Sequence, residues 1–390
     1  MSDPIVIVSA ARTPMGGFQG DLSGLTGPQL GAVAIKAAVE RARLSPEQVQ
    51  EVIMGCVLPA GVGQAPARQA ALGAGLPLAA GCTTINKVCG SGMKATMLAH
   101  DLLVAGTNEV MVAGGMESMS NAPYLLPKAR GGYRLGHGQL LDHMFLDGLE
   151  DSYSKENKGR LMGTFAEDCA GHFDFTRAAQ DDFAVASTTR AQNAIKDGSF
   201  TWEVAPVTVA GRKGDVLVEH DEQPPKAQLE KIGSLKPAFR KDGTVTAANS
   251  SSISDGAAAL VLMRKSTADK LGLAPLATIV GHATHAQDPA WFTTAPVGAM
   301  QKVLAKAGWG VDEVDLWEIN EAFAVVTMAA MKEMKLPHDK VNVNGGACAL
   351  GHPIGALRKR GLKRGVASLC IGGGEATAMA IELDASVACG

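Results

Sequence analysis

The fold is decided by residues 86–95, which read Asn-Lys-Val-Cys-Gly-Ser-Gly-Met-Lys-Ala. A β-capable run at residues 83–85 leads into Cys89, two glycines follow, and a helix-forming run covers residues 93–105. β-Branched residues favour a strand, whereas closely spaced glycines favour a tight turn. The stretch therefore predicts a strand, a turn and a helix, with a lone cysteine at the turn.

The position of this cysteine suits nucleophilic chemistry. Free N–H groups at a helix N-terminus favour the thiolate form of Cys89. Gly90 and Gly92 carry no Cβ, so a bulky substrate can approach the backbone and N–H groups can face a developing oxyanion. The alternative is a buried structural cysteine beside a glycine turn, and this stretch alone leaves both interpretations open.

The composition is that of a soluble globular chain of two or three domains. It has 390 residues, 19% charged and 46% hydrophobic, which is enough for sizeable cores. A net charge of −3 gives no global attraction to nucleic acid or acidic membranes. Seven cysteines without a CxxC pair argue against a disulfide framework or a zinc site. The sequence shows no signal-peptide pattern and no bilayer-length apolar run, so we expect a cytoplasmic protein that binds no membrane. From the charge and the cysteine spacing we expect that it binds neither nucleic acid nor a metal.

Strands and helices alternate in the first part of the chain. Apolar runs at residues 5–9, 49–57 and 109–113 predict buried strands, and residues 28–43 predict an amphipathic helix. With the Cys89 unit, the order β-α-β-α-β indicates an α/β fold with a mostly parallel sheet covered by helices.

The character of the chain changes between residues 118 and 244, where charges, prolines and glycines become more frequent. One clear helix is expected at residues 177–197, with Thr176 as its N-cap and Gly198 at its end. We interpret this region as an inserted domain with long loops.

The first pattern returns towards the C-terminus. Residues 298–320 repeat the helix–strand order of residues 31–55, and residues 341–353 correspond to the unit around Cys89. Two copies of one α/β unit indicate two halves related by a pseudo-two-fold axis, each with a functional turn at the carboxyl edge of its sheet. We expect an N-terminal half at residues 1–118 and 245–268, a loop domain at 119–244, and a C-terminal half at 269–390.

Four motifs carry the chemistry. They are Cys89 with its glycines, Gly-His352-Pro-Ile-Gly, Cys370-Ile-Gly372-Gly-Gly and Asn320-Glu-Ala-Phe. A Cys–His pair can activate a thiolate, a second thiol can serve as acid or base, and glycine N–H groups and an Asn amide can bind an oxyanion. Singly, Cys370 could be a small buried hydrophobe and His352 a turn-stabilising group. Together they favour acyl transfer, because a cysteine that attacks a thioester keeps the acyl group activated.

These motifs, with Gly-Gly-Met-Glu117-Ser-Met-Ser, resemble those of the thiolase family over residues 5–382. The resemblance implies a five-layered α-β-α-β-α core, a loop domain over the active site, and a homotetramer. It also implies the biosynthetic type of reaction: reversible Claisen condensation of two acetyl-CoA to acetoacetyl-CoA and CoA through an acetyl-cysteine intermediate. Acyl-CoA thioesters are then substrates, and no cofactor is implied.

The resemblance also implies roles for particular residues. Cys89 would be the acylated nucleophile, His352 would activate it, and Cys370 would remove the α-proton of the second acetyl-CoA. His352 and a water held by Asn320 would stabilise the enolate oxygen, and the N–H groups of Cys89 and Gly372 would bind the acyl oxygen. The implied coenzyme A contacts are Leu149, Met162, Ala247, Ser251, Ala322 and Phe323, with Phe239 near the adenine.

The sequence departs from the family pattern at three places. Leu161 stands where a histidine is common, which affects one pantetheine contact. Phe292 stands where a methionine is common in the acyl pocket, which affects chain-length selectivity. After Ala356 the sequence is about a dozen residues shorter than thiolases are, too short for a buried crossover helix. We therefore expect an interruption of the chain between Ala356 and Leu357, flanked by helix on both sides.

Three alternatives to the biosynthetic reaction stay open. The nearest is a broader-chain 3-ketoacyl-CoA thiolase of β-oxidation, which a chain-length profile would separate. A decarboxylating ketoacyl synthase shares the fold, but the cysteine in Cys370-Ile-Gly-Gly-Gly argues against it. A non-enzymatic relative with a dead site is disfavoured by the complete set of Cys89, Asn320, His352 and Cys370.

Overall fold

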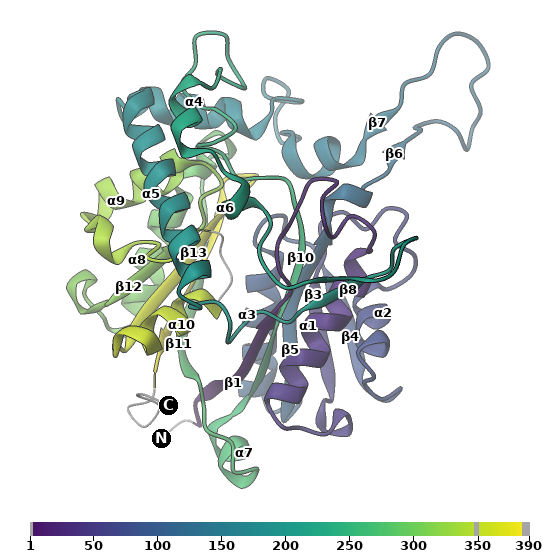
Figure 1. Ribbon diagram of the computed structural model, residues 1–390, viewed down its shortest axis with the longest axis vertical. Helices are drawn as coiled ribbons and strands as arrows, with labels where there is room; N and C mark the ends of the chain where they lie inside the picture. Colours follow the sequence, from purple (N-terminus) through teal and green to yellow (C-terminus); the bar gives the residue numbers. More distant parts are fainter. Residues whose placement is uncertain (1–2, 347–350, 384–390) are drawn as a thin grey trace.

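The computed structural model describes residues 3–346 and 351–383 and is built around one ten-stranded sheet (Figure 1). Nine strands follow the order β12-β13-β14-β11-β1-β10-β5-β3-β4, and β2 pairs with β10. The strands are β1 (Ile5–Arg12), β2 (Gly16–Gly17), β3 (Glu51–Gly55), β4 (Gly81–Ile85), β5 (Val110–Ser118), β10 (Ser254–Arg264), β11 (Ala277–Ala286), β12 (Leu316–Ile319), β13 (Arg364–Ile371) and β14 (Glu375–Glu382).

The sheet is mixed, which corrects the expectation of a mostly parallel one. Strand β3 pairs in parallel with β4 and β5, and β12 pairs in parallel with β13. The long strands β10 and β14 run antiparallel to their neighbours in the middle of each half. Strand β14 returns directly from β13 through a turn at Gly373 and Gly374, both with positive φ, a conformation that glycine adopts without strain.

The internal repeat predicted from the sequence is present. The order β1-β10-β5-β3 in the first half corresponds to β11-β14-β13-β12 in the second. The counterpart of β4 is reduced to one bridge between Trp317 and Val341. The halves meet where β1 pairs with β11, at Val6 opposite Thr278 and Ile7 opposite Ala277.

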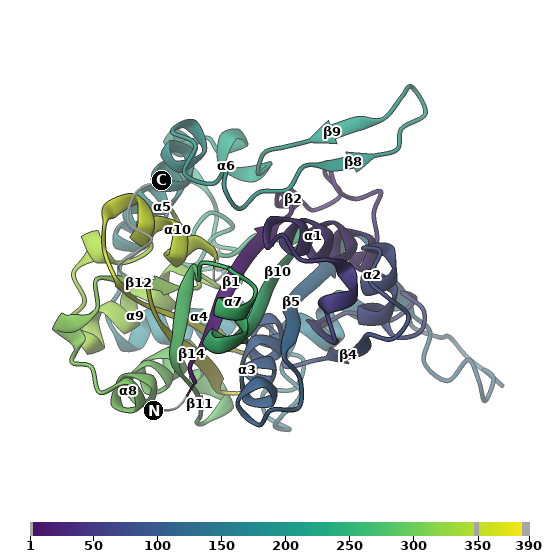
Figure 2. The ribbon, with the colours of Figure 1, turned by 90° about the horizontal axis from the view of Figure 1, so that it is seen from below.

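Helices cover and separate the two halves of the sheet, giving the five expected layers (Figure 2). Helices α1 (Gly27–Arg41) and α2 (Pro66–Gly73) cover the first half, and α8 (Ala295–Ala307) and α9 (Ala324–Met334) cover the second. Helices α3 (Ser91–Val104) and α10 (Gly351–Arg360) share a central core with both halves. Burial of apolar surface on both faces of the sheet stabilises this stacking.

The expected interruption between Ala356 and Leu357 is wrong, because α10 runs continuously through both residues. Ile354, Ala356 and Leu357 are fully or almost fully buried in the central core. The helix ends at Arg360, and the next residue, Gly361, has a φ of 65°. Ten residues are therefore enough for this crossover, because the apolar part of the helix covers the sheet and its basic end reaches the surface.

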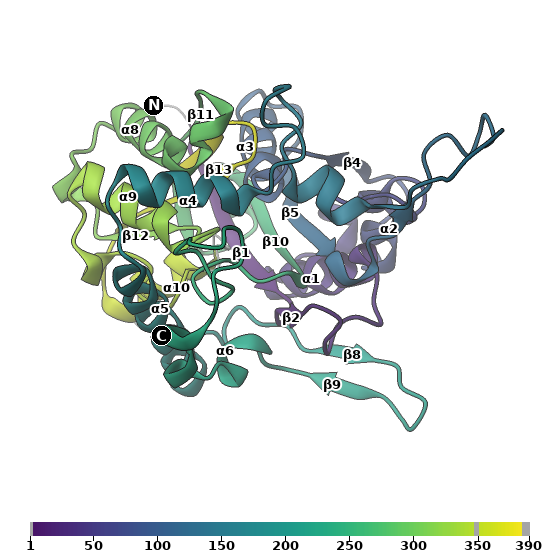
Figure 3. The ribbon, with the colours of Figure 1, turned by 90° about the horizontal axis from the view of Figure 1, so that it is seen from above.

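The segment between β5 and β10 forms the loop-rich insertion. It contains α4 (Met162–His172), α5 (Arg177–Lys196), α6 (Gln223–Lys226), and the two-stranded pairs of β6 (Tyr124–Leu125) with β7 (Leu141–Asp142) and β8 (Val207–Val209) with β9 (Val216–Val218). Thr176 caps α5 by accepting a hydrogen bond from the Ala179 N–H at 3.2 Å, which confirms the predicted helix start. Both hairpins project from the body (Figure 3). The short helix α7 (Lys265–Lys270) follows β10.

Candidate active site

Cys89 lies in the turn between β4 and α3, as the sequence predicts. The side chain of Asn86 accepts from the Val88 N–H at 2.8 Å, and Ser91 Oγ donates to the Val88 carbonyl at 2.7 Å. Val88 itself has a φ of 46°. A Cβ on Gly90 would lie 2.4 Å from Ile371 Cδ1, so the missing side chain at Gly90 lets the buried Ile371 pack against this turn. Side-chain hydrogen bonds and a close approach of β13 therefore fix the turn.

The second half brings Gly372 to the thiol of Cys89. The N–H groups of Gly372 and of Cys89 both stabilise the Cys89 thiolate. A Cβ on Gly372 would lie 3.5 Å from Met162 Sδ and 4.0 Å from Val88 Cγ1, so the two turns and the start of α4 converge here. Tyr153 Oη donates to the Gly372 carbonyl at 3.3 Å. Two N–H donors thus face the Cys89 sulfur, so the site can stabilise negative charge at this atom.

The thiol of Cys89 is nevertheless protonated in the free protein. Burial raises the pKa of Cys89, and the N–H groups of Gly372 and Cys89 offset this only in part. The residue is exposed towards a cavity, but protein surrounds the sulfur on its other sides. The expectation that the helix start alone favours a thiolate is therefore not met, because desolvation is the larger effect.

Cys370, near the end of β13, lies close enough to Cys89 for a thiolate at Cys89 to affect its ionisation. It is buried among aromatic residues that include Phe292 and Phe323. Burial, and then the charge of a nearby Cys89 thiolate, raise the pKa of Cys370 well above its ordinary value. The structure therefore brings the two predicted thiols together, with Cys370 in its neutral form.

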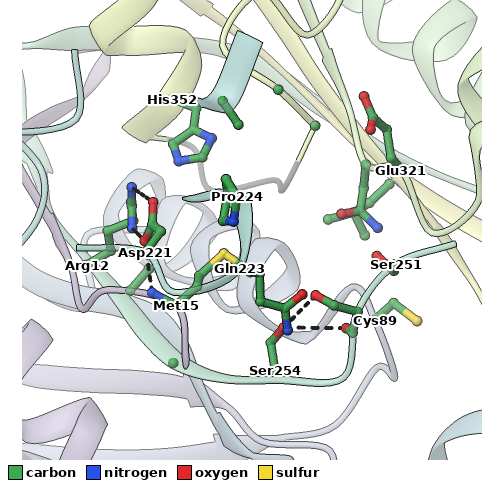
Figure 4. A pocket seen from close by; sticks show the side chains of 18 of the residues that line it. Arg12, Met15, Cys89, Asp221, Gln223, Pro224, Ser251, Ser254, Glu321 and His352 are labelled. Atoms are coloured by element: carbon green, nitrogen blue, oxygen red, sulfur yellow. Dashed lines mark hydrogen bonds and ion pairs between the residues drawn. The ribbon is translucent and has the colours of Figure 1, made fainter. Parts of the chain in front are cut away.

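A cavity of about 890 Å³ opens over Cys89 (Figure 4). Asn320 lines it directly after β12, and its N–H donates to the Ser368 carbonyl at 3.0 Å. Ala247 and Ser251 line it as well, and the Ser251 N–H donates to the Ala322 carbonyl at 2.9 Å. Four of the predicted catalytic and coenzyme A residues, Asn320, His352, Ala247 and Ser251, thus share one cavity with Cys89.

The other predicted contacts lie outside the lining of this cavity, in the described part of the chain. Phe239 meets Phe323 edge to face, with ring centroids 5.9 Å apart, and its ring fills the space beside Gly163. Phe292 meets Phe165 in the same way at 6.2 Å. The predicted site residues that lie outside the lining are Cys370, Gly372, Leu149, Met162, Phe239, Phe292, Ala322 and Phe323.

His352 lies on α10 and is paired with carboxylates. Its Nε2 lies 3.0 Å from Glu203 Oε1 and its Nδ1 lies 3.8 Å from Glu318 Oε1, and Phe200 stacks on the ring at 4.9 Å. Neither ring nitrogen makes a hydrogen bond of standard geometry within the described chain, so the contacts are ion pairs. Burial alone would lower the pKa of His352, but Glu203 and Glu318 outweigh it and raise the pKa to about 9.

The expected pairing of His352 with Cys89 is therefore not present. Between residues of the described chain, no hydrogen bond or ion pair joins the two side chains, and Figure 4 shows them on different parts of the cavity wall. The physical reason is the position of α10, which delivers His352 to the buried carboxylates of Glu203 and Glu318. In this arrangement the ring is an imidazolium and carries no free lone pair for the thiol proton.

Sequence reasoning missed the charged network that holds His352. Arg12 Nε lies 2.6 Å from Glu203 Oε1, and its terminal nitrogens bind both oxygens of Asp221 at 2.6 and 2.9 Å. All three side chains are buried and line the cavity. The partners are 191 and 209 residues apart in the chain. The one available signal was an arginine three residues after the predicted buried strand at residues 5–9.

Glu321, from the Asn320 motif, is a further carboxyl on the cavity wall and is partly buried. It accepts hydrogen bonds from Ser187 Oγ at 2.6 Å and from Asn342 Nδ2 at 2.7 Å. Burial nevertheless raises the pKa of Glu321 to about 7, because those hydrogen bonds compensate only in part. Near neutral pH this carboxyl is therefore available in both protonation states.

Comparison with known families covers almost the whole chain. Residues 5–266 match the family described as "Thiolase, N-terminal domain", and residues 273–383 match "Thiolase, C-terminal domain".

Relatives match over nearly their full length. The chain is 51% identical over 394 residues to "Acetyl-CoA acetyltransferase 2" of Arabidopsis thaliana, with 97% of each chain covered. It is 51% identical over 392 residues to "Acetyl-CoA acetyltransferase" of Cupriavidus necator, covering 97% of this chain and 99% of the relative. The crystal structure of the Bacillus anthracis acetyl-CoA acetyltransferase superposes with a TM-score of 0.93 at 41% identity, covering 98% of this chain and 99% of that one.

A search for membrane-spanning helices in residues 3–346 and 351–383 finds none of sufficient length and hydrophobicity.

Proposed function

This chain belongs to the thiolase family of acyltransferases, and on that premise we propose that it is an acetyl-CoA acetyltransferase. The reaction is the reversible Claisen condensation of two acetyl-CoA to acetoacetyl-CoA and CoA. The observation that carries the proposal is the convergence of Cys89, Cys370 and the Gly372 N–H from two halves of the chain. The names of the relatives from Arabidopsis thaliana and Cupriavidus necator support the acetyl substrate.

In the first half-reaction, Cys89 Sγ attacks the thioester carbonyl of acetyl-CoA. A new S–C bond forms, the bond to the CoA sulfur breaks, and the thiol proton leaves with CoA. The N–H groups of Cys89 and Gly372 bind the oxygen while it carries negative charge. Because the product is itself a thioester, the acetyl group stays reactive towards carbon.

In the second half-reaction, Cys370 is the base for the α-proton of the second acetyl-CoA. The resulting carbanion attacks the acetyl carbonyl, and Cys89 leaves as a thiolate that takes the proton back from Cys370. Loss of a proton from Cys370 is unfavourable in the free protein because its pKa is raised. The Cys370 thiol therefore first loses its proton to water and regains one after it has reprotonated Cys89, which closes the proton balance. Acetylated Cys89 cannot ionise, so no thiolate at Cys89 opposes the Cys370 thiolate at this step.

Asn320 and His352 complete the proposed machinery. Asn320 lines the cavity with Cys89, which supports its role as holder of a water beside the enolate oxygen. His352 can accept the Cys89 proton only after its ring leaves Glu203, so its role depends on a rearrangement of that ion pair.

Coenzyme A is proposed to lie against two groups of residues. Ala247 and Ser251 lie on the cavity wall, and Met162, Phe239 and Phe323 form a connected cluster that begins beside Gly372. Leu149 and Ala322 complete the set. The thioesters are substrates, and the proposed reaction needs no metal or organic cofactor because the acyl transfer and the α-proton transfer each have a protein group.

The organisation of the protein is proposed to follow the same pattern. The N-terminal half comprises residues 1–118 and 245–268, the loop domain 119–244, and the C-terminal half 269–390. The end of β5 at Ser118 and the loop-rich segment that follows it support the first boundary. We further propose a cytoplasmic homotetramer whose partners are acyl-CoA substrates, without nucleic acid or membrane.

A steady-state assay tests this function against the broader-chain thiolase. Condensation is measured with acetyl-CoA, and thiolysis is measured with 3-ketoacyl-CoA substrates of four to eight or more acyl carbons. Efficient condensation together with a thiolysis optimum at acetoacetyl-CoA is the expected result. An optimum at longer chains would replace the proposal by the degradative activity.

A further inference from the structure

Three metal-ligating side chains meet at the junction of the two halves, outside the candidate active site. His100 and Asp101 lie on α3, and His282 lies on β11. His282 Nε2 is 2.9 Å from Asp101 Oδ1 and 3.2 Å from His100 Nδ1, and His100 Nδ1 is 3.1 Å from Asp101 Oδ1. The three ligand atoms therefore form a nearly equilateral triangle.

The triangle is separate from the catalytic cavity. None of the three residues belongs to the described residues that line the cavity over Cys89. His100 is nine residues along α3 from Ser91, a rise of about 14 Å along the helix axis. Viewed from below, α3 and β11 approach each other at the edge of the molecule (Figure 2).

Hydrogen bonding accounts for this arrangement only in part. The rings of His100 and His282 meet edge to face with centroids 4.8 Å apart, and one nitrogen of each ring faces the other. If both nitrogens carry protons to donate to Asp101, two donors oppose each other at 3.2 Å. A cation inside the triangle would instead use one lone pair of each of the three atoms.

We propose that His100, Asp101 and His282 bind one divalent transition-metal ion of the zinc type. Three ligands about 2.0–2.1 Å from a tetrahedral zinc lie about 3.3 Å from one another, which is close to the observed 2.9–3.2 Å. Two imidazoles and one carboxylate are ligands that zinc accepts, whereas magnesium and calcium prefer oxygen alone. Asp101 is 55% exposed, so the fourth position opens to solvent and takes a water.

The consequence of binding is structural. A metal here joins α3, which begins directly after the Cys89 turn, to β11 in the second half of the sheet. A ligand that binds the folded state and not the unfolded chain stabilises the fold, and the gain grows with the logarithm of one plus the ratio of ligand concentration to Kd. Zinc should therefore raise the melting temperature of the protein without taking part in acyl transfer.

The test is equilibrium dialysis of the purified full-length protein against Zn²⁺, with bound metal measured by mass spectrometry. Co²⁺ serves as a second probe, because its visible absorption reports a tetrahedral site. We expect one metal per chain, a raised melting temperature, and no competition by Mg²⁺. His282→Gln and Asp101→Asn should weaken binding by at least about tenfold, the smallest loss usual for a residue that supports a metal site. His137→Gln, at an exposed histidine in the insertion, is the matched control and should leave binding unchanged.

Two results would overturn the proposal. One is the absence of stoichiometric Zn²⁺ and Co²⁺ binding to the unmodified chain. The other is equal affinity in the unmodified chain, His282→Gln and Asp101→Asn. Because Asp101 is largely exposed, its substitution keeps the test valid if His282→Gln fails to fold.

Discussion

Lys87 and Glu375 form an ion pair that ties together the two turns of the candidate active site. Lys87 precedes Cys89 by two residues, and Glu375 follows Gly372 by three. The side chains are 20% and 32% exposed, so the pair is only partly screened by solvent. It joins the two halves of the chain at the point where the N–H groups of Cys89 and Gly372 must keep a fixed separation.

Removal of this pair should impair catalysis slightly and specifically. A partly exposed ion pair contributes up to about 1 kcal/mol, which is about fivefold in rate. We therefore expect Glu375→Gln to lower kcat/KM for condensation by up to about fivefold, and the double exchange Lys87→Glu with Glu375→Lys to recover part of it. Lys265→Gln, which removes an exposed pair within α7, should change nothing. Equal kcat/KM in Glu375→Gln and the unmodified enzyme would show that the pair does not position the turns.

Cys370→Ala should separate the two half-reactions. Acetylation of Cys89 needs the nucleophile and the oxyanion donors, whereas carbon–carbon bond formation needs a base. Loss of a general base costs about 10²–10⁴-fold, so condensation should fall by that factor while Cys89 still becomes acetylated. Rapid-quench assays measure acetylation and condensation separately in the variant and in the unmodified enzyme. Near-normal condensation in the variant would remove Cys370 from the mechanism.

The ion pairs of His352 should make the stability of the fold pH-dependent. The ordinary pKa of 6.5 is raised to about 9 in the folded protein, so the folded state holds the proton more tightly than the unfolded chain does. This stabilisation is complete below about pH 6.5 and is lost as the pH rises through about 9. The melting temperature of the unmodified protein should therefore fall more steeply between these pH values than that of His352→Gln. If the melting temperatures of the two proteins changed in parallel with pH, the ion pairs of His352 would not stabilise the fold.

Phe292 should restrict the acyl chain. It is buried beside Cys370 and Phe165, and a rigid ring adapts to a longer chain less well than a flexible thioether does. We expect thiolysis of acetoacetyl-CoA to be preferred over that of a C8 substrate, and Phe292→Met to reduce this preference. Equal kcat/KM for both substrates in the unmodified enzyme would show that Phe292 does not limit the pocket.

Much of the fold could be predicted because its signals are local. The strand, turn and helix around Cys89 follow from β-branched residues and glycines, and the capping of α5 follows from Thr176. The repeat identified the two halves. The antiparallel course of β10 and β14 was missed, because pairing direction depends on partners far away in the sequence.

The site was less predictable where it depends on long-range electrostatics. The proximity of Cys89 to Gly372 and Cys370 agrees with the motifs, but the raised pKa of Cys89 results from burial that no motif encodes. The position of His352 depends on Glu203, which lies 149 positions earlier in the chain and is itself held by Arg12. The interruption expected after Ala356 failed for a related reason, since a short helix with one buried face proved sufficient.

The acetyl-cysteine at Cys89 is the central claim, and intact-protein mass spectrometry tests it most directly. The unmodified protein, Cys89→Ala and Cys370→Ala are each incubated with acetyl-CoA and measured without further reaction. We predict one added acetyl group on the unmodified protein and on Cys370→Ala, with the label on Cys89, and none on Cys89→Ala. An acetyl adduct of equal occupancy on Cys89→Ala would contradict the assignment of the nucleophile.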